Sequence, residues 1–451
     1  MRIIVKSLLL WLAVVSFIFA EGEVGAQQSD TRSSNPSASA PQRSPTPAGH
    51  DSPPDSPKTL EDTIDASEDD EPPSRKLIRW NEYQGPNFTL QFGAGILYDY
   101  GAFAQDQDSK RQIAMYPGHK VRDFRLLFRG KLFPRIKRSI TWSAGVMYDA
   151  PNSAWRMRQT GIMIATPELW GSVFVGRSKE GFSLNKIMVG YDGLTMERST
   201  LNDATIPILA DGIKWLGYIP KRKILWNLGY YNDVLSKGQS FSTYSSQVSG
   251  RFVVLPILSE KENKVLHLGV MVRVGKPLDN KIRFRSRPES NVAPYFIDTG
   301  TFESDSTRMA GFEAYYRGKR WFFGNEYWWV FVSSNTKSNP TFHGGDVIMS
   351  YLFNDATRPY NTAGGYFRAV DPKRSVFEGG PGAWELVLRY TRSDFNDKTV
   401  QGGTFGRFTS QVNWYLSQNL RLEFNYGYGR LNRFDLKGNT QFLQSRFQFY
   451  F

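Results

Sequence analysis

The chain contains no cysteine, only four histidines and no long apolar run beyond its first residues. Without cysteine it can form neither disulfides nor thiolate metal sites, which fits an exported protein. After Ala26 no stretch approaches the roughly 20 consecutive apolar residues that a membrane helix needs. The histidines (His50, His119, His267 and His343) are scattered, without a Ser or Asp partner at motif spacing. The sequence therefore gives no support for a metal site, a cofactor, membrane helices or histidine-based hydrolysis.

Charge is distributed unevenly along the 451 residues, whose net charge is +13. Residues 1–75 carry 6 Lys and Arg against 12 Asp and Glu, a balance of −6, so residues 76–451 stand at +19. A domain this basic indicates anionic partners, which include small anions, nucleic acid and lipopolysaccharide. Nucleic acid is the least favoured, because the basic residues alternate with apolar ones and no nucleic-acid-binding motif accompanies them.

The N-terminal part divides into two segments. Residues 1–26 are typical of a secretory signal: Arg2 and Lys6 precede an apolar run, and Val24–Ala26 supplies small residues for cleavage. A retained anchor helix is the less favoured interpretation. Residues 27–75 are rich in Ser, Pro, Asp and Glu, so they bury too little apolar surface to fold, and we predict a disordered linker. The folded domain is expected over residues 76–451.

From about Leu77 the chain alternates apolar and polar residues in segments of roughly ten. In Leu420–Arg430, for example, Leu and aromatic side chains occupy every second position, which is the period of a β-strand. Similar segments are Phe88–Tyr100, Arg122–Phe133, Thr141–Asp149, Lys223–Tyr230, Val265–Arg273, Met309–Tyr316, Ala383–Thr391 and Leu443–Phe451. We identify about 16 such segments, and the pattern is least clear around 181–218 and 279–300.

Three features favour a membrane barrel over a soluble sandwich. The apolar faces often begin or end with aromatic residues, as the two membrane interfaces require. The segments have the length of a tilted membrane strand, and their polar faces carry charge and glycine rather than a second core. The last residue, Phe451, resembles the assembly signal of bacterial outer-membrane barrels. We therefore predict an all-β fold, a transmembrane antiparallel β-barrel of about 16 strands in the outer membrane.

Basic residues recur on the polar faces of these segments. The columns are Arg125, Arg129 and Lys131; Arg156 and Arg158; and Lys281, Arg283, Arg285 and Arg287. Like charges about 7 Å apart repel, so passing anions or carboxylates across the lumen must compensate them. Rings of Arg and Lys select anions in pores. The alternative is that these residues lie in a solvated loop or bind the phosphates of lipopolysaccharide. This alternative applies most to the Lys281 column.

The C-terminal third carries more specific motifs. Thr357–Asp397, with its Arg-Pro-Tyr, Pro-Lys and Gly-Ala-Trp-Glu-Leu blocks, resembles the phosphate-selective porin O and P family. Further similar blocks are Gln411–Arg430, Gly176–Leu184, Met196–Ser199, Arg283–Ser290, Asp298–Gly300 and Ala310–Trp329 with its paired Glu313 and Glu326. The resemblance spans roughly 120–451 and does not include residues 27–75.

The resemblance implies a 16-stranded, trimeric barrel that passes anions and prefers phosphate or related oxyanions. By motif position, Arg283, Arg285 and Arg287 are the first candidates for the family's arginine ladder, and Arg125 and Arg129 follow. Lys179 and Arg198 lie in matching blocks, and the lysines of the constriction loop are not marked clearly enough to assign.

The leading hypothesis is a diffusion porin for small anions, phosphate and chloride among them, that sits in a bilayer with lipopolysaccharide. The alternatives are a structural or adhesion barrel with a closed lumen and, less favoured, a barrel hydrolase.

Overall fold

The structure is a computed structural model that describes residues 80–451, except 150–153, 189, 234–243, 260 and 355. The predicted signal (1–26) and linker (27–75) lie outside the described residues. Among the described residues, no helix is both long and apolar enough to cross a membrane.

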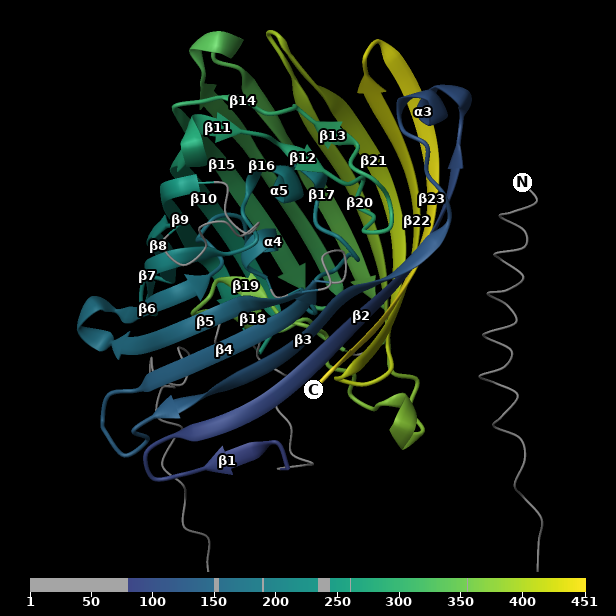
Figure 1. Cartoon of the computed structure of the whole chain (residues 1–451). Helices are drawn as coiled ribbons and strands as arrows, with labels where there is room; N and C mark the ends of the chain where they lie inside the picture. The colour runs from purple at the N-terminus through teal and green to yellow at the C-terminus, as the bar shows by residue number, and fades with distance from the viewer. Residues whose placement is uncertain (1–79, 150–153, 189, 234–243, 260, 355) are drawn as a thin grey trace, which may run out of the picture. The chain divides into compact units, whose positions relative to one another are not determined.

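Sixteen antiparallel strands form one closed barrel (Figure 1), which confirms the predicted fold class. β2 pairs with β3, each strand pairs with the next, and β23 closes the barrel on β2 from Gly95↔Tyr450 to Gln105↔Thr440. The strands are β2 (Thr89–Gln105), β3 (Gly118–Leu132), β4 (Ile140–Asp149), β5 (Ala154–Thr166), β6 (Gly171–Ser178), β7 (Ala210–Ile219), β8 (Ile224–Asn232), β9 (Tyr244–Ser259), β10 (Lys264–Pro277), β15 (Ser306–Gly318), β16 (Trp321–Ser333), β17 (Thr341–Leu352), β20 (Ala383–Asp397), β21 (Val400–Tyr415), β22 (Leu420–Arg433) and β23 (Leu436–Tyr450).

The remaining elements are short and lie before β2 or in the connections. β1 (Glu82–Gln84) pairs with the start of β2. Apart from four short 3-10 helices, the other described elements are the strands β11 (Lys281–Ile282), β12 (Arg285–Ser286), β13 (Ile297–Asp298), β14 (Phe302–Glu303), β18 (Tyr360–Asn361) and β19 (Tyr366–Phe367), and the α-helices α3 (Gln107–Gln112), α4 (Leu184–Ile187) and α5 (Thr200–Thr205).

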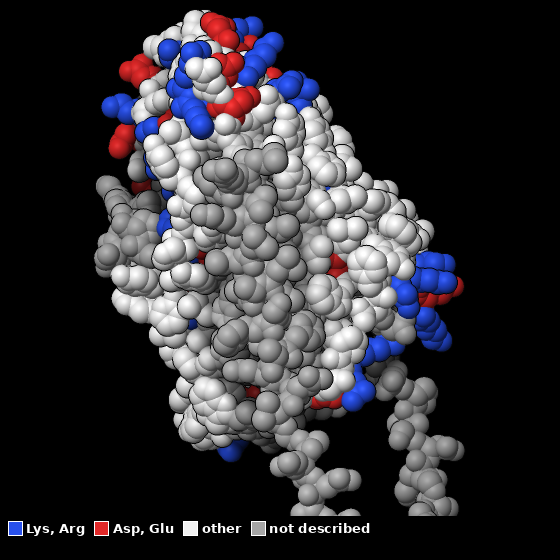
Figure 2. Space-filling view, turned by 90° about the vertical axis from the view of Figure 1, so that its right-hand side faces the viewer, with Lys and Arg blue, Asp and Glu red and all other residues white. Residues whose placement is uncertain are grey.

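The barrel wall is apolar outside and polar inside. In β10, for instance, Val270, Val272 and Val274 are exposed on the outer face, whereas Met271 and Arg273 are buried inside. On the face in Figure 2 the visible Lys, Arg, Asp and Glu gather at the top and toward the lower right, and the described side chains between these groups are mostly uncharged. An apolar outer band with charged ends is what a barrel in a bilayer requires.

Three long connections fold inward rather than away from the barrel. Two of them, 179–209 and 278–305, start at the rim opposite the one where β2 begins and β23 ends, which we call the terminal rim. The third, 353–382, starts at the terminal rim. α4, α5, β18 and β19 are seen within the outline of the wall in Figure 1. The first two connections fall in the regions where the alternating pattern was least clear, because they are not membrane strands.

The inward segments share buried apolar clusters with the wall. Phe182 of loop 179–209 and Phe284 of loop 278–305 belong to one cluster with Trp328 of β16. Leu184 of α4 belongs to another cluster with Phe367 of β19. Apolar packing therefore fixes both loops and the segment 353–382 inside the barrel.

Candidate functional site

A hollow of about 530 Å³ lies inside the barrel, lined by β2–β5, β23 and the loops 179–209 and 278–305. We call it the basic cavity. Its basic lining residues are Lys120, Arg122, Arg125, Arg156, Arg158, Lys179, Lys186, Arg198, Arg285, Arg287 and Arg446. Its acidic lining residues are Asp123, Glu197, Asp203 and Glu289. This excess of cations attracts anions into the cavity.

Of the eleven residues expected in the pathway, seven line the basic cavity. They are Arg125, Arg156, Arg158, Lys179, Arg198, Arg285 and Arg287. Arg129 and Lys131 line a second hollow of about 320 Å³, which also contains residues of β1. Lys281 and Arg283 line neither hollow, although they belong to the same column as Arg285 and Arg287.

The Lys281 column lies in loop 278–305 and not in a membrane strand. Its alternation nevertheless persists, because Ile282 and Phe284 are buried while Arg283 and Arg285 are exposed. Arg283 donates from Nε to Asp298 Oδ1 at 2.8 Å, and this hydrogen bond lowers the pKa of Asp298. A carboxylate therefore compensates the positive charge of Arg283. This is one of the two kinds of compensation that we expected for a column of like charges.

Arg285 and Arg287 are held by an aromatic ring instead. Their guanidinium carbons lie 4.5 Å and 4.4 Å from the ring centre of Tyr295. Arg287 also donates to the carbonyl of Ala293. The structure gives neither arginine an ion pair with a described carboxylate. Cation–π contact fixes their position without neutralising their charge, so they present net positive charge to the cavity.

A β-bulge brings a further arginine into the cavity. β3 pairs Asp123 with Leu97 and then Val121 with Tyr98, so Arg122 is the extra residue. The bulge shifts the alternation by one, which places Lys120 and Arg122 beside Asp123 and Arg125. Strict alternation from the sequence misses Lys120 and Arg122 for this reason.

Carboxylates of the wall and loop anchor several guanidinium groups. Arg446 donates to Asp99 at 2.6 Å and to Glu197 at 2.6 Å, and Arg122 donates to Glu197 at 2.7 Å. Burial opposes ionisation of Glu197, but Arg122 and Arg446 outweigh it and lower its pKa to about 2. Glu197, in the Met-Glu-Arg element of the resemblance, therefore binds loop 179–209 to β3 and β23.

Lys186, in α4, was not identified from the sequence. Its Nζ donates to the carbonyl of Ile206 at 2.9 Å, and it lines the cavity. Burial and then the charge of Arg198 lower the pKa of Lys186 to about 7. The sequence does not predict that Lys186 lies at the site, because only the folding of loop 179–209 brings it close to the basic residues of the columns.

The N-terminal end of α4 is bound by acidic residues from the opposite wall. Glu326 of β16 accepts from Ser183 Oγ at 2.6 Å and from the backbone N–H of Asn185 at 2.8 Å. Glu313 of β15 accepts from the backbone N–H of Leu184 at 2.8 Å. These are the paired glutamates of the resemblance, and their observed contacts hold the loop in place.

Lys179 and Arg198 act at the other end of α4. Lys179 Nζ donates to the carbonyl of Met188 at 2.9 Å, and Arg198 donates to the same carbonyl at 2.8 Å. Arg198 also donates to the carbonyl of Asn185 at 2.8 Å. Both residues line the cavity, and their hydrogen bonds also fix the helix that forms its side.

The stretch 191–197 of the same loop is bound through its backbone carbonyls. Side chains of the far wall donate hydrogen bonds to these carbonyls. The pairs, donor first, are Gln448 to Tyr191, Arg421 to Gly193, Gln411 and Asn413 to Leu194, Arg446 to Met196, and Arg389 to Glu197. These hydrogen bonds use only the backbone of the loop, so they hold its course against the wall whatever side chains it carries.

The segment 353–382 is tied to the same interior from the terminal rim. Arg358 pairs with Glu385 at 2.8 Å and donates to the carbonyl of Asp192 at 2.9 Å. Arg251 of β9 donates to the carbonyl of Gly365 at 2.7 Å. Gly365 has φ 68°, and a Cβ there would approach Leu225 to 2.6 Å, so glycine is required at this contact.

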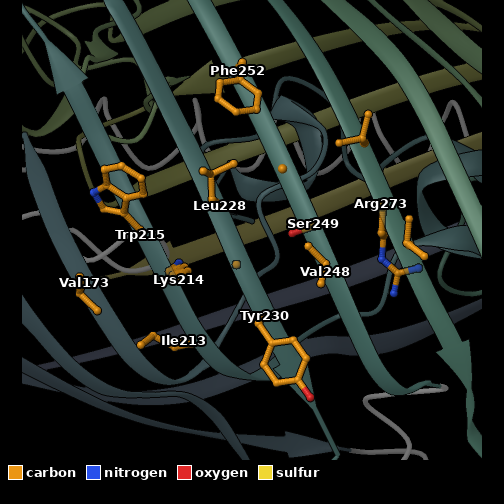
Figure 3. Close-up of a pocket in the computed structure, with 14 residues that line it drawn as sticks. Val173, Ile213, Lys214, Trp215, Leu228, Tyr230, Val248, Ser249, Phe252 and Arg273 are labelled. Atoms are coloured by element: carbon orange, nitrogen blue, oxygen red, sulfur yellow. The ribbon is translucent and has the colours of Figure 1, made fainter. Parts of the chain in front are cut away.

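A third hollow, of about 500 Å³, opens on the outside of the barrel across β6–β10 (Figure 3). Its outward side chains are apolar and include Val173, Ile213, Trp215, Leu228, Tyr230, Val248 and Phe252. Lys214, Ser249 and Arg273 belong to the inner face and are buried. This hollow is therefore part of the lipid-facing surface and not of the lumen.

The closed barrel, with its apolar outer band and charged interior, has the architecture of the outer-membrane porins. The chain belongs to the phosphate-selective porin O and P family, whose family model matches residues 90–451. This membership confirms the resemblance seen in the sequence, and it removes the support for a barrel hydrolase.

Solved structures and a relative extend the comparison. The fold is similar to the outer membrane channel DcaP of Acinetobacter baumannii, at 10% identity and TM-score 0.51 over 80% of this chain and 98% of that chain. It is also similar to OmpF of Salmonella typhi in complex with daunomycin, at 10% identity and TM-score 0.51 over 82% and 100%. At this identity the likeness shows the fold alone. An uncharacterized protein of Caulobacter vibrioides is 30% identical over 184 residues, 40% of this chain and 36% of the relative.

Proposed function

We propose that the barrel is a diffusion channel for small anions, with a preference for phosphate and related oxyanions. The observation that carries the proposal is the lining of the basic cavity, in which Lys and Arg far outnumber Asp and Glu. Such a lining raises the local concentration of anions and repels cations. The description of the family as phosphate-selective supports the finer preference.

Arginine suits this role because its planar fork donates two hydrogen bonds to neighbouring oxygens. Arg285 and Arg287, which no described carboxylate neutralises, are the proposed first contacts for an entering anion. Chloride enters the same field but is a single acceptor atom, so it cannot match the two parallel hydrogen bonds of the fork. Phosphate therefore occupies the cavity longer than chloride does.

The proposed route continues along the inner face of β3 toward the terminal rim. Arg125 lines the basic cavity, and Arg129 and Lys131 line the second hollow. Arg125 and Arg129 are four residues apart on one strand, about 13 Å. Weak sites at that spacing let an anion leave each one, as conduction requires.

The other expectations stand as proposals beside this one. They are export by the signal 1–26, a disordered linker over 27–75 before a barrel domain over 76–451, assembly as a homotrimer, and contact of the outer surface with lipopolysaccharide. Trimeric association is what the family resemblance implies.

Single-channel recording on the purified protein tests the anion preference. Inorganic phosphate is expected to block the chloride current at concentrations far below that of chloride. Linear addition of phosphate and chloride currents, without block, would contradict a phosphate preference and leave a general anion pore.

The second candidate is a structural barrel with a closed lumen. It is favoured by one observation, the filling of the interior by 179–209, 278–305 and 353–382, which pack into shared apolar clusters. A protein that inserts into bilayers but gives no single-channel conductance would support this candidate against the channel.

A further inference from the structure

Part of the lining of the basic cavity is apolar, and this part contributes nothing to the binding of inorganic anions. Met147 of β4 and Ile208 of loop 179–209 line it, together with Leu97, Met188 and Met196. Ile208 is 46% exposed, so its side chain presents carbon to the water of the lumen. Phosphate and chloride gain nothing from such a surface.

Charge and apolar surface lie next to each other in this cavity. Arg158 Nη1 lies 3.7 Å from the sulfur of Met147. Both residues line the same hollow as Arg285 and Arg287, whose charge remains available. The volume of about 530 Å³ falls within the roughly 300–1,000 Å³ of sites that enclose small organic molecules. A single tetrahedral oxyanion fills only a small part of it.

We propose that the basic cavity binds organic oxyanions in which a phosphate or carboxylate group is joined to an apolar body. The arginines hold the anionic group, and the body lies against Met147 and Ile208. Methionine suits this contact, because its unbranched, polarizable side chain adapts to apolar bodies of different shape. The inference rests on the proposed anion channel and names the class of solute that its cavity prefers.

Block of the chloride current by matched phosphate esters tests this. Methyl phosphate and phenyl phosphate carry the same charged group at pH 8 and differ in their apolar body. We expect phenyl phosphate to block at about tenfold lower concentration than methyl phosphate. Equal block by the two esters, or no block by either, would overturn the inference.

Substitutions in the apolar part of the cavity test whether it causes the difference between the two esters. Met147→Gln with Ile208→Gln is expected to bring the ratio of the two blocking concentrations close to one. Ile136→Gln, in the exposed turn 133–139 outside the cavity, is the matched control and keeps the tenfold ratio. An advantage of phenyl phosphate that survives the double substitution would place its binding elsewhere and contradict the inference.

The reversal potential of each protein in a KCl gradient separates the two claims. Cation preference of the native channel defeats the proposed function itself. Anion preference with equal block by both esters defeats only the inference about organic oxyanions. Anion-selective conductance of the double variant also shows that it has folded.

Discussion

Glu326 accepts a hydrogen bond of 2.6 Å from the hydroxyl of Ser183, a residue 143 positions away in the chain. Glu326 also stands in register between Glu313 and Asp346 on the neighbouring strands. Three carboxylates side by side repel unless donors face them. The N-terminal end of α4 supplies such donors, so the acidic row and the inward loop stabilise each other.

Removal of this contact should loosen loop 179–209. We expect Glu326→Ala to raise single-channel conductance and open-channel noise, because Ser183 and Asn185 lose their acceptor, at about 1 kcal/mol for each hydrogen bond. Glu326→Gln keeps one acceptor oxygen and should fall between the native protein and the alanine variant. Conductance unchanged in both variants would mean that the loop does not limit the flow of ions.

Substitution of the two arginines over Tyr295 tests the source of selectivity. Arg285→Gln with Arg287→Gln should lower the ratio of anion to cation permeability several-fold, since their charge is not neutralised by a described carboxylate. Arg283→Gln is the control from the same column, because Arg283 is paired with Asp298 and lies outside the cavity. An equal fall of the permeability ratio in both variants would show that the charge responsible for selectivity lies at the rim and not in the cavity.

The anion preference should also depend on pH. The pKa of Lys186 is lowered to about 7, so this side chain is charged below pH 7 and neutral above it. Burial raises the pKa of Asp192, which belongs to the same loop but does not line the cavity, to about 6, so the negative charge it gains acts in the same direction from a greater distance. Chloride selectivity should therefore fall as the pH rises from 5.5 to 8, in about these ranges.

Reversal potentials in KCl measure this, since chloride does not titrate. Lys186→Arg keeps its charge over the whole range and should remove most of the change near pH 7. A selectivity that stays constant from pH 5.5 to about 8 in the native protein would contradict the shifted pKa of the lysine.

The ion pair of Arg358 and Glu385 should matter for stability. Both side chains are buried, and Arg358 also bonds the carbonyl of Asp192. Glu385→Ala leaves the guanidinium without its carboxylate and should lower the free energy of unfolding by about 3–5 kcal/mol. Arg138→Ala breaks an exposed pair with Glu168 and should cost less than about 1 kcal/mol. Urea titration of the detergent-solubilised protein compares the two, and similar losses would show that the buried pair carries no special weight.

The sequence predicted the wall of the barrel well, because an apolar exterior and a wet interior impose alternation on the strands, which only local bulges such as the one in β3 interrupt. Leu420–Arg430, identified by that pattern, lies in β22, and Phe88–Tyr100 lies in β2 except for Phe88, which directly precedes that strand. The alternation weakened around 181–218 and 279–300. Residues 181–209 and 279–300 lie in the two inward loops, where packing against the wall replaces contact with lipid, whereas residues 210–218 belong to the wall strand β7.

The site could be predicted only in part. Arg125 follows from alternation, but Arg122 enters the cavity through a bulge, which the pattern does not reveal. Arg285 was identified from its column, yet whether its neighbour Arg283 meets a carboxylate depends on how loop 278–305 returns to Asp298. Lys186 depends on the folding of a whole loop into the lumen, a long-range contact that no local signal encodes.

The reversal potential of the full-length protein in a planar bilayer, under a tenfold gradient of KCl, tests the central claim most directly. The basic cavity predicts a potential whose sign reports chloride as the more permeant ion. The magnitude should fall in the Arg285→Gln, Arg287→Gln variant. A potential of the opposite sign, with potassium more permeant, would contradict the account.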